Sequence, residues 1–200
     1  EKAYPIERDR ERYFQNLVRT ASPSLGYHLI SLLAEIGFVK TVWTTNFDGL
    51  MEKCAHYYSL APISITSDTS DRLYRPEISN ELLTIALHGD YKYGKLKNTA
   101  KELDKQSDDF VKALRHKLTD EDLLIFGYSG RDFSIMKAIK EAYSTQGAGK
   151  LFWCGYGDTP TKSVIQLIEE INAAGREAYY IPTNGFDETL YLIARYCLSE

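Results

Sequence analysis

Residues 40–50 of the chain read KTVWTTNFDGL, and this stretch decides the fold. Its first six residues form an apolar run typical of a buried strand. Helical spacing follows from about residue 49 to 58, and Asp48 stands where a helix-capping carboxylate is expected. A buried strand that runs directly into a helix is the repeating element of α/β proteins.

The same alternation continues along the chain. Apolar runs predict further strands at residues 63–66, 82–87, 123–126, 151–154 and 178–181. Periodicity predicts the other helices at residues 6–18, 22–37, 104–118, 132–143, 162–174 and 186–197, with Ser22-Pro23 starting the second helix, Gly37 ending it, and a loop at 67–80. Continuous apolar strands are expected where helices cover both faces of a parallel sheet. We therefore expect an α/β fold with a doubly wound, mostly parallel, Rossmann-like sheet and helices on both faces.

Composition narrows the class of protein. The chain has 200 residues, of which 44% are hydrophobic and 26% charged, which fits one sizeable globular domain and excludes wholesale disorder. A net charge of −4 lacks the basic field of nucleic-acid binders, so we expect no nucleic-acid binding. We also expect no membrane segment, because no apolar run approaches the ~20 residues that a spanning helix needs. Three scattered cysteines, Cys54, Cys154 and Cys197, predict reduced thiols and a cytoplasmic location.

Polar clusters follow three of the predicted strands. They are residues 44–49 (TTNFDG), residues 87–90 (LHGD) and residues 127–132 (GYSGRD). Ligands of open parallel sheets bind beyond the carboxyl ends of the strands, and we expect the three clusters to share that edge. Each cluster alone has a purely structural interpretation, because Asn46 and Asp48 can form an Asx turn and a cap, and His88 can be a satisfied strand-end histidine. Taken together, the three favour a functional site.

The three clusters resemble the motifs of the sirtuin-like family, whose members bind NAD and cleave its nicotinamide–ribose bond. The family has a Thr-x-Asn-x-Asp strand end, a His-Gly strand end and a Gly-x-Ser strand end, in that order. They match here as residues 44–48, 88–89 and 127–129, and the resemblance covers roughly residues 24–198. The spelling is most similar to a bacterial branch found in NAD-depleting defence proteins. Three ordered motifs are far more specific than a lone glycine loop.

The resemblance implies a role for each matching residue. Asn46 is expected to position the water or nucleophile that attacks the ribose, and His88 to act as a base on a ribose hydroxyl or to orient it; an unperturbed imidazole is largely neutral at pH 7. Asp48 would hold the nicotinamide end of NAD, and Gly127 and Ser129 would meet the adenosine ribose and phosphates. The full set of expected NAD-binding residues is Thr44, Thr45, Asp48, Gly89, Gly127, Tyr128, Ser129 and Arg131. Arg131 can pair either with a phosphate or with a neighbouring carboxylate.

The chain departs from the deacylating members of the family in its cysteines. Those proteins carry a four-cysteine zinc module between the His-Gly and Gly-x-Ser motifs. Residues 90–122 contain no cysteine, and His116 alone cannot build a tetrahedral site, so we expect no zinc. The zinc module also helps to form the acyl-peptide groove, which makes deacylation the weaker interpretation.

A second departure concerns the phosphates of NAD. The family's first strand leads into a glycine-rich loop whose amides receive the pyrophosphate, and no such loop precedes Thr44. Gly147-Ala148-Gly149 precedes a predicted strand and cannot replace it. We expect residues 1–200 to be a single sirtuin-like NAD-binding domain that lacks this N-terminal strand and loop, either as a fragment or as a divergent member.

The leading hypothesis is an NAD hydrolase that yields nicotinamide and ADP-ribose, as the effector domain of a larger bacterial defence protein. A protein deacylase or ADP-ribosyltransferase would use the same first half-reaction. A non-catalytic module that senses NAD or ADP-ribose is the alternative from another class. A neighbouring domain or a homo-oligomer is the expected protein partner.

Overall fold

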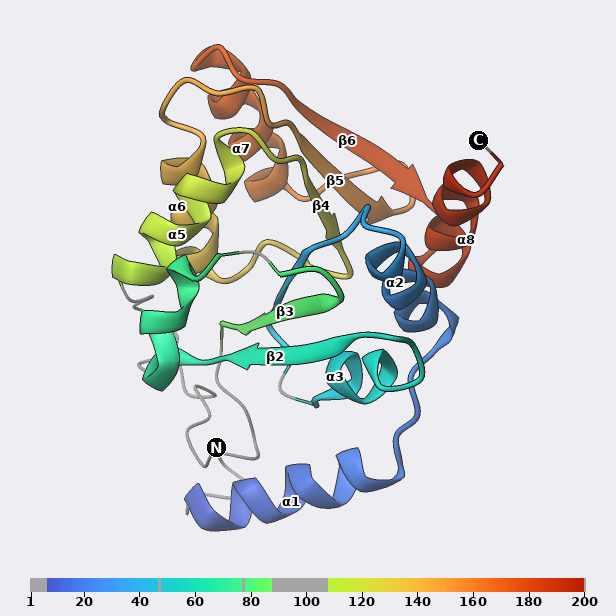
Figure 1. Cartoon of the computed structure of the whole chain (residues 1–200). Coiled ribbons are helices and arrows are strands. Elements are labelled where there is room, and N and C mark those ends of the chain that lie inside the picture. Colours follow the sequence, from blue (N-terminus) through green and yellow to red (C-terminus); the bar gives the residue numbers. More distant parts are fainter. Residues whose placement is uncertain (1–6, 47, 77, 88–107, 200) are drawn as a thin grey trace. The chain divides into compact units, whose positions relative to one another are not determined.

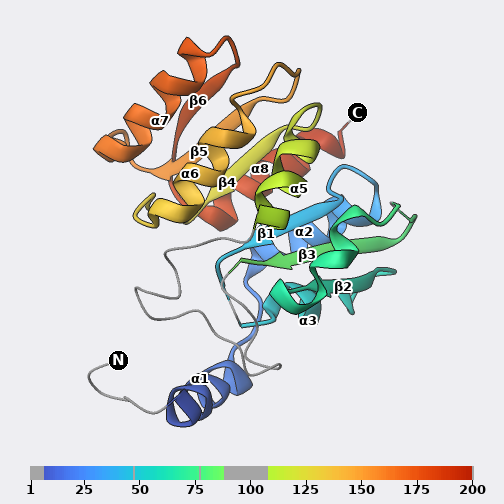
Figure 2. The ribbon, with the colours of Figure 1, turned by 90° about the vertical axis from the view of Figure 1, so that its left-hand side faces the viewer.

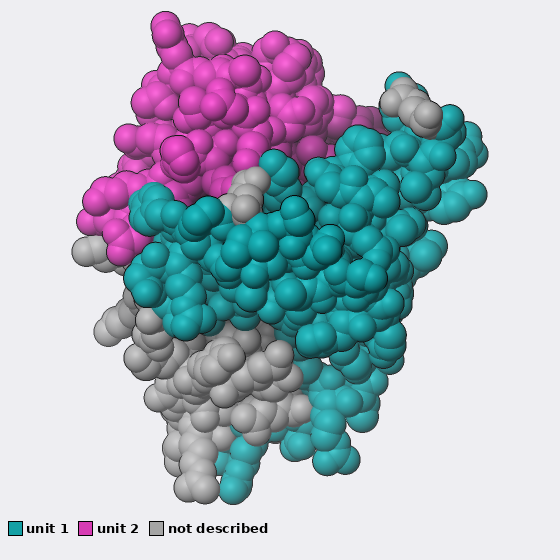
Figure 3. Space-filling view, in the orientation of Figure 1, with its two compact units in different colours: residues 1–103, 190–200 teal, residues 104–189 magenta. Residues whose placement is uncertain are grey.

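A computed structural model describes residues 7–46, 48–76, 78–87 and 108–199. The chain divides into two compact units, residues 1–103 with 190–200 (unit 1) and residues 104–189 (unit 2), coloured separately in Figure 3. The strands of the described residues form two three-stranded parallel sheets, with helices around them (Figure 1). The predicted α/β, Rossmann-like class is confirmed, whereas the assignment of all 200 residues to a single domain stays a prediction.

Unit 1 is built on a sheet with the strand order β1-β3-β2. Its elements are α1 (Glu7–Thr20), α2 (Leu25–Glu35), β1 (Thr41–Thr44), α3 (Leu50–Ala55), β2 (Ala61–Ile65), the 3₁₀ helix η1 (Ser67–Tyr74) and β3 (Glu81–Ala86). Leu83 of β3 pairs in parallel with Thr41 of β1 and with Ile63 of β2. The five residues 82–86 are all buried, as the continuous apolar run predicts for a central strand.

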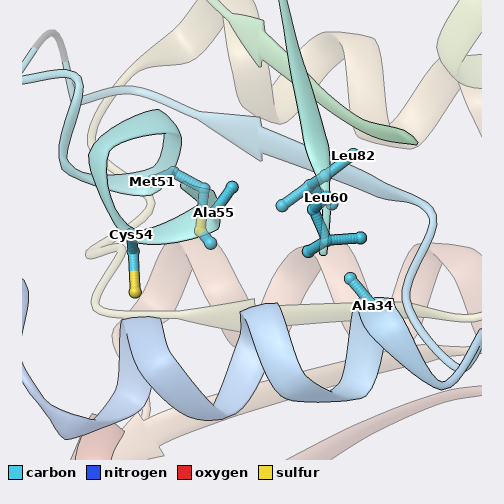
Figure 4. Packing of buried hydrophobic residues seen from close by; sticks show 6 residues of the cluster. All are labelled: Ala34, Met51, Cys54, Ala55, Leu60 and Leu82. Carbon is cyan, nitrogen blue, oxygen red and sulfur yellow. The ribbon is translucent and has the colours of Figure 1, made fainter. Parts of the chain in front are cut away.

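Helices α2 and α3 share a hydrophobic cluster with β3 (Figure 4). Its buried members are Ala34, Met51, Cys54, Ala55, Leu60 and Leu82. The partly buried side chains of Tyr27, Val42 and Tyr58 pack against it. Because apolar burial stabilises by roughly 25 cal/mol per Å², this cluster fixes α2 and α3 against the sheet.

Both ends of α2 illustrate local sequence rules. The N-cap is Ser24, with an extended backbone, so the predicted start at Ser22-Pro23 is two residues too early. Pro23 thus precedes the helix, and Leu25 is its first residue. At the other end Gly37 has a φ of +87°, and the amide of Phe38 donates to the carbonyl of Leu33 at 2.9 Å. This left-handed glycine ends the helix as predicted.

The predicted loop at residues 67–80 contains η1, so that prediction is wrong over Ser67–Tyr74. The amide of Thr66 donates to Thr69 Oγ1 at 3.0 Å, and the amide of Thr69 returns a bond to the carbonyl of Thr66 at 3.0 Å. Such reciprocal bonds stabilise a short helix in a polar segment. The segment has no apolar periodicity, so its sequence does not predict a helix.

Unit 2 is built on a sheet with the order β4-β5-β6. Its elements are α5 (Asp108–Leu118), β4 (Leu123–Phe126), α6 (Phe133–Ala142), β5 (Leu151–Tyr156), α7 (Lys162–Ala173) and β6 (Ala178–Thr183), and α8 (Phe186–Cys197) begins here and ends in unit 1. Figure 2 shows α5, α6 and α7 side by side along this sheet. Trp153, within β5, is 2% exposed and belongs to the core of this unit.

A buried arginine ties together the loop before β5. Arg176 is 5% exposed, and its guanidinium donates to the carbonyls of Thr145 (2.9 Å), Leu118 (2.6 Å) and Gly149 (2.6 Å). The guanidinium also lies 4.8 Å from the centre of the Tyr143 ring. Leu118 is the last residue of α5, where the helix dipole favours a cation.

The glycines of this loop serve close backbone packing. A Cβ on Gly147 or Gly149 would collide with the main chain of Thr119 or Glu121. The amide of Ala148 donates to the carbonyl of Thr119 at 2.7 Å. Gly147-Ala148-Gly149 therefore holds the end of α5 against β5, as expected for a loop that precedes a strand.

Within the described ranges, no helix combines the length and the apolar composition needed to cross a membrane.

Candidate functional site

The first polar cluster begins where β1 ends, in unit 1. Thr44 is the last residue of that strand, and its Oγ1 accepts a hydrogen bond from the backbone amide of Asn46 at 2.9 Å. This short threonine turn bends the chain away from the sheet. The side chain of Thr45 is half-buried, and that of Asn46 is exposed. The turn thus presents the Asn46 amide to solvent at the carboxyl end of the strand.

The Asn46 side chain is itself held by a residue from another element. Its Nδ2 donates to the hydroxyl of Tyr27, in the first turn of α2, at 3.2 Å. Sequence patterns alone do not single out Tyr27, because it lies inside a helical pattern 19 residues upstream of Asn46. The contact can be found only from the three-dimensional structure, in which α2 and the end of β1 come together.

Asp48 lies two residues before the next helix, α3. Its Oδ1 accepts a hydrogen bond from the amide of Leu50, the first residue of α3, at 3.0 Å. Gly49 between them has a φ of +64°, which lets the chain turn sharply into the helix. The N-cap of α3 is Gly49, so the predicted cap at Asp48 is one residue too early, although its carboxylate still accepts from the first helical amide; its contact with NAD stays a prediction.

The second cluster follows β3. His88 and Gly89 lie outside the residues that the structure describes. The described chain reaches Leu87, whose amide donates to the carbonyl of Thr44 at 2.9 Å. Thr44 and Ala86 are also register partners. The ends of β1 and β3 are therefore neighbours, as expected for two strand ends that contribute to one site.

The third cluster follows β4, in unit 2. Gly127 has a φ of +64°, and apart from its chain neighbours no atom of the described residues lies within 4 Å of the position that a Cβ would occupy. Ser129 and Arg131 are exposed. Open space beside a glycine and an exposed hydroxyl two residues later leave room for a ribose or phosphate group at this loop.

Tyr128 and Asp132 stabilise the same loop from within. The Tyr128 hydroxyl donates to the carbonyl of Asp132 at 3.3 Å, and its ring lies 5.8 Å from that of Trp153. Burial, assisted by the Asp132 carboxylate, raises the pKa of Tyr128 well above its usual range. Asp132 Oδ1 accepts from the amides of Ser134 (2.9 Å) and Ile135 (3.3 Å), so Asp132 is the N-cap of α6.

Two hydroxyl residues near the start of α7 also brace this loop. Ser163 Oγ donates to the carbonyl of Gly130 at 3.1 Å, and Thr161 Oγ1 donates to that of Ser129 at 3.4 Å. Gly130 has a φ of +71°, and a Cβ there would lie 3.1 Å from a methyl of Val164. The shape of the Gly-x-Ser loop therefore depends on α7, which sequence reasoning did not connect with it.

Comparison of the sequence with models of known protein families gives one match. A family model described as a SIR2-like domain matches residues 40–177. This chain belongs to the SIR2-like family. The matched residues contain all three polar clusters and exclude Tyr27. No individual curated protein matches the chain.

The sirtuin-like resemblance is thereby confirmed, and with it a general relation to NAD, since SIR2-like proteins are generally NAD-dependent enzymes. The described residues of this SIR2-like domain offer neutral polar groups to such a molecule. In unit 1 this is the exposed Asn46 amide beyond β1, and in unit 2 it is the exposed Ser129 beyond β4; contact of either residue with NAD stays a prediction. Such groups suit the hydroxyl-rich riboses of a dinucleotide.

No group of three or more histidine, cysteine or acidic residues lies close enough to hold a metal in the part of the chain that the structure describes. Cys54, Cys154 and Cys197 are free thiols. Burial raises the pKa of Cys154 to about 11, and burial also raises the pKa of Cys54. The absence of zinc stays a prediction for metal analysis.

Proposed function

We propose that this SIR2-like domain hydrolyses NAD to nicotinamide and ADP-ribose. The observation that carries the proposal is the exposed Asn46 amide, which Thr44 and Tyr27 hold at the carboxyl end of β1. Membership in a family of NAD-dependent enzymes supplies the substrate. The end of β3 adjoins the end of β1, and His88 follows Leu87 in the sequence, which supports a second polar group for the same site.

In this hydrolysis the main task of the protein is to position the ribose and the attacking water. The bond between the pyridinium nitrogen and the ribose C1′ breaks, and its electron pair leaves with nicotinamide, which becomes neutral. The ribose then carries the positive charge as an oxocarbenium-like centre. A water oxygen bonds to C1′ and releases a proton, which completes ADP-ribose.

An asparagine suits this step because its Oδ1 is a hydrogen-bond acceptor that does not itself become a nucleophile. The Oδ1 of Asn46 accepts a hydrogen bond from the attacking water. This bond directs the lone pair of the water oxygen toward C1′. His88 accepts a proton or orients a ribose hydroxyl. Thr44, Thr45, Asp48 and Gly89 are assigned to the nicotinamide end, and Gly127, Tyr128, Ser129 and Arg131 to the adenosine ribose and phosphates.

Deacylation and ADP-ribosyl transfer share the first bond-breaking step but need a second substrate. The sequence from residue 90 to 122 offers no cysteines for the zinc module that shapes an acyl-peptide groove. Hydrolysis in the absence of any acylated peptide therefore distinguishes the proposed reaction. A role in bacterial defence, as the NAD-depleting part of a larger protein, follows from the resemblance of the motifs.

The test is release of nicotinamide from NAD, measured by chromatography, for the wild type and for Asn46→Ala. Loss of a group that acts mainly in the transition state should lower kcat roughly a hundredfold. Asn184→Ala is the matched control, because Asn184 is also exposed and also follows a parallel strand, β6. Its rate should equal that of the wild type.

Asn46→Ala should keep the wild-type circular dichroism spectrum, because the side chain is exposed. Nicotinamide release by this variant at the wild-type rate would remove Asn46 from the mechanism. Tight NAD binding without any turnover would replace hydrolysis with a sensing function. His88→Ala should lower kcat more than it raises KM, whereas a raised KM alone would restrict His88 to binding.

A further inference from the structure

We infer that Tyr27 is a positioning residue for the reaction, because its hydroxyl fixes the orientation of the Asn46 amide. The inference rests on the proposed function of Asn46. It adds a residue that lies outside both the three polar clusters and the matched span of the family.

The geometry gives Asn46 two anchors from two different elements. Thr44 Oγ1 holds its backbone amide at 2.9 Å, and the Tyr27 hydroxyl holds its Nδ2 at 3.2 Å. The first bond fixes where the residue leaves the strand, and the second fixes rotation about the bond that carries the terminal amide. A terminal amide otherwise has a broad, roughly two-fold torsional preference.

Tyr27 can act as an anchor because its ring does not move freely. The partly buried Tyr27 packs against the hydrophobic cluster shared by α2 and α3. Lys53 of α3 also binds the segment that leads into α2, where its Nζ donates to the carbonyl of Ala21 at 2.8 Å. Beyond α3, the amide of Ser59 donates to Glu35 Oε1 at 2.9 Å. The hydroxyl of Tyr27 is therefore presented from a rigid support.

The direction of the bond matters for chemistry. Asn46 Nδ2 is the atom that Tyr27 holds, so Oδ1 is the end of the amide left to face a water or a ribose hydroxyl. Oδ1 only accepts hydrogen bonds, whereas Nδ2 only donates them. An amide rotated by half a turn would offer donors to the water and would direct its hydrogens, rather than its lone pair, toward the reacting carbon.

Tyr27→Phe tests this with the loss of one oxygen atom. The ring and its packing remain, but the amide loses its partner. Since one neutral hydrogen bond is removed, we expect kcat to fall roughly three- to tenfold while KM changes less than twofold. A role confined to substrate binding would raise KM, and a merely structural role would lower the melting temperature without changing kcat.

Tyr58→Phe is the matched control. The Tyr58 hydroxyl lies 3.3 Å from Nδ1 of His28, the residue next to Tyr27 on α2. The Tyr58 ring also packs against the same cluster. This variant thus removes a tyrosine hydroxyl from the same helix interface without touching Asn46, and its kcat should be that of the wild type.

A double-mutant comparison isolates the pair. In the Asn46→Ala background, Tyr27→Phe should change the residual rate less than twofold, because the amide that Tyr27 positions is gone. The inference is overturned if Tyr27→Phe alone leaves kcat unchanged, or if it lowers the rate equally in both backgrounds.

A spectroscopic measurement separates this inference from the proposed function. The side-chain amide resonance of Asn46 is assigned by its absence in Asn46→Ala, and Tyr27→Phe should shift it whereas Tyr58→Phe should not. If the wild type releases no nicotinamide but the resonance shifts, hydrolysis fails and the positioning contact stands. An unshifted resonance would refute the contact whatever the activity.

Discussion

Replacement of Arg176 by methionine should destabilise the protein strongly, because this buried guanidinium joins three backbone segments. It donates to carbonyls at the end of α5 and at both ends of the 145–149 loop. Methionine keeps most of the side-chain length and its apolar contacts. The substitution therefore removes the charge and the hydrogen bonds and little else.

The magnitude follows from the contacts. Three hydrogen bonds from a charged donor, at about 1.5–3 kcal/mol each, set a gross loss of roughly 5–9 kcal/mol. Removal of the cation also removes the cost of burying it, which is several kcal/mol. We expect a net loss of about 2–4 kcal/mol in the free energy of unfolding. For a chain of this size that lowers the melting temperature by roughly 5–15 °C.

Urea unfolding followed by tryptophan fluorescence measures this change, since the buried Trp153 lies in the same unit as Arg176. An unchanged m-value would show that the variant unfolds from the same compact state. Arg176→Lys should lose about half as much, because one ammonium cannot match a guanidinium fork that spans three carbonyls. The exposed Arg195 of α8 provides the control, and Arg195→Met should stay within about 0.5 kcal/mol. Arg176→Met within that same margin would refute the reasoning.

Four further outcomes are expected. Thr84→Val should raise the free energy of unfolding by about 1 kcal/mol in the same urea assay, because the Oγ1 of this 1% exposed residue has no hydrogen-bond partner among the described residues. Gly130→Ala should lower it by about 1–3 kcal/mol, whereas an unchanged value would mean that the loop tolerates a Cβ at positive φ. In a mass-spectrometric alkylation assay, Cys154 should stay unlabelled at pH 8 and react only as the pH rises, because a pKa of about 11 leaves roughly a thousandth of it as thiolate. Metal analysis should find no stoichiometric zinc, and a chelator should leave the melting temperature unchanged; about one zinc per chain would contradict this.

Elements with a strong local signal could be predicted from the sequence. The apolar run around Leu82 identified β3, and the helical period over residues 132–143 identified α6. These elements depend on residues a few positions apart, so the local sequence pattern is enough to predict them. The three polar clusters were found for the same reason, since each lies within a few residues of a strand end.

Features that depend on distant packing could not be predicted. The contact of Tyr27 with Asn46 and that of Ser163 with Gly130 join residues 19 and 33 positions apart. The sequence around these residues contains no pattern that predicts either contact. Capping is subtler, because Ser22 and Ser24 both suit an N-cap, and only the packing of α2 decides for Ser24.

The division of the chain into units has a consequence for its synthesis. Unit 2 is one continuous segment, residues 104–189, whereas unit 1 needs residues 190–200 in addition to the first 103. On a ribosome that adds about 5–20 residues per second, unit 2 has its whole sequence before unit 1 does. The turn that bears Asn46 emerges early, but the unit that supports it is assembled only after the last turns of α8 leave the exit tunnel. Synthesis therefore completes the sequence of the second unit before that of the first.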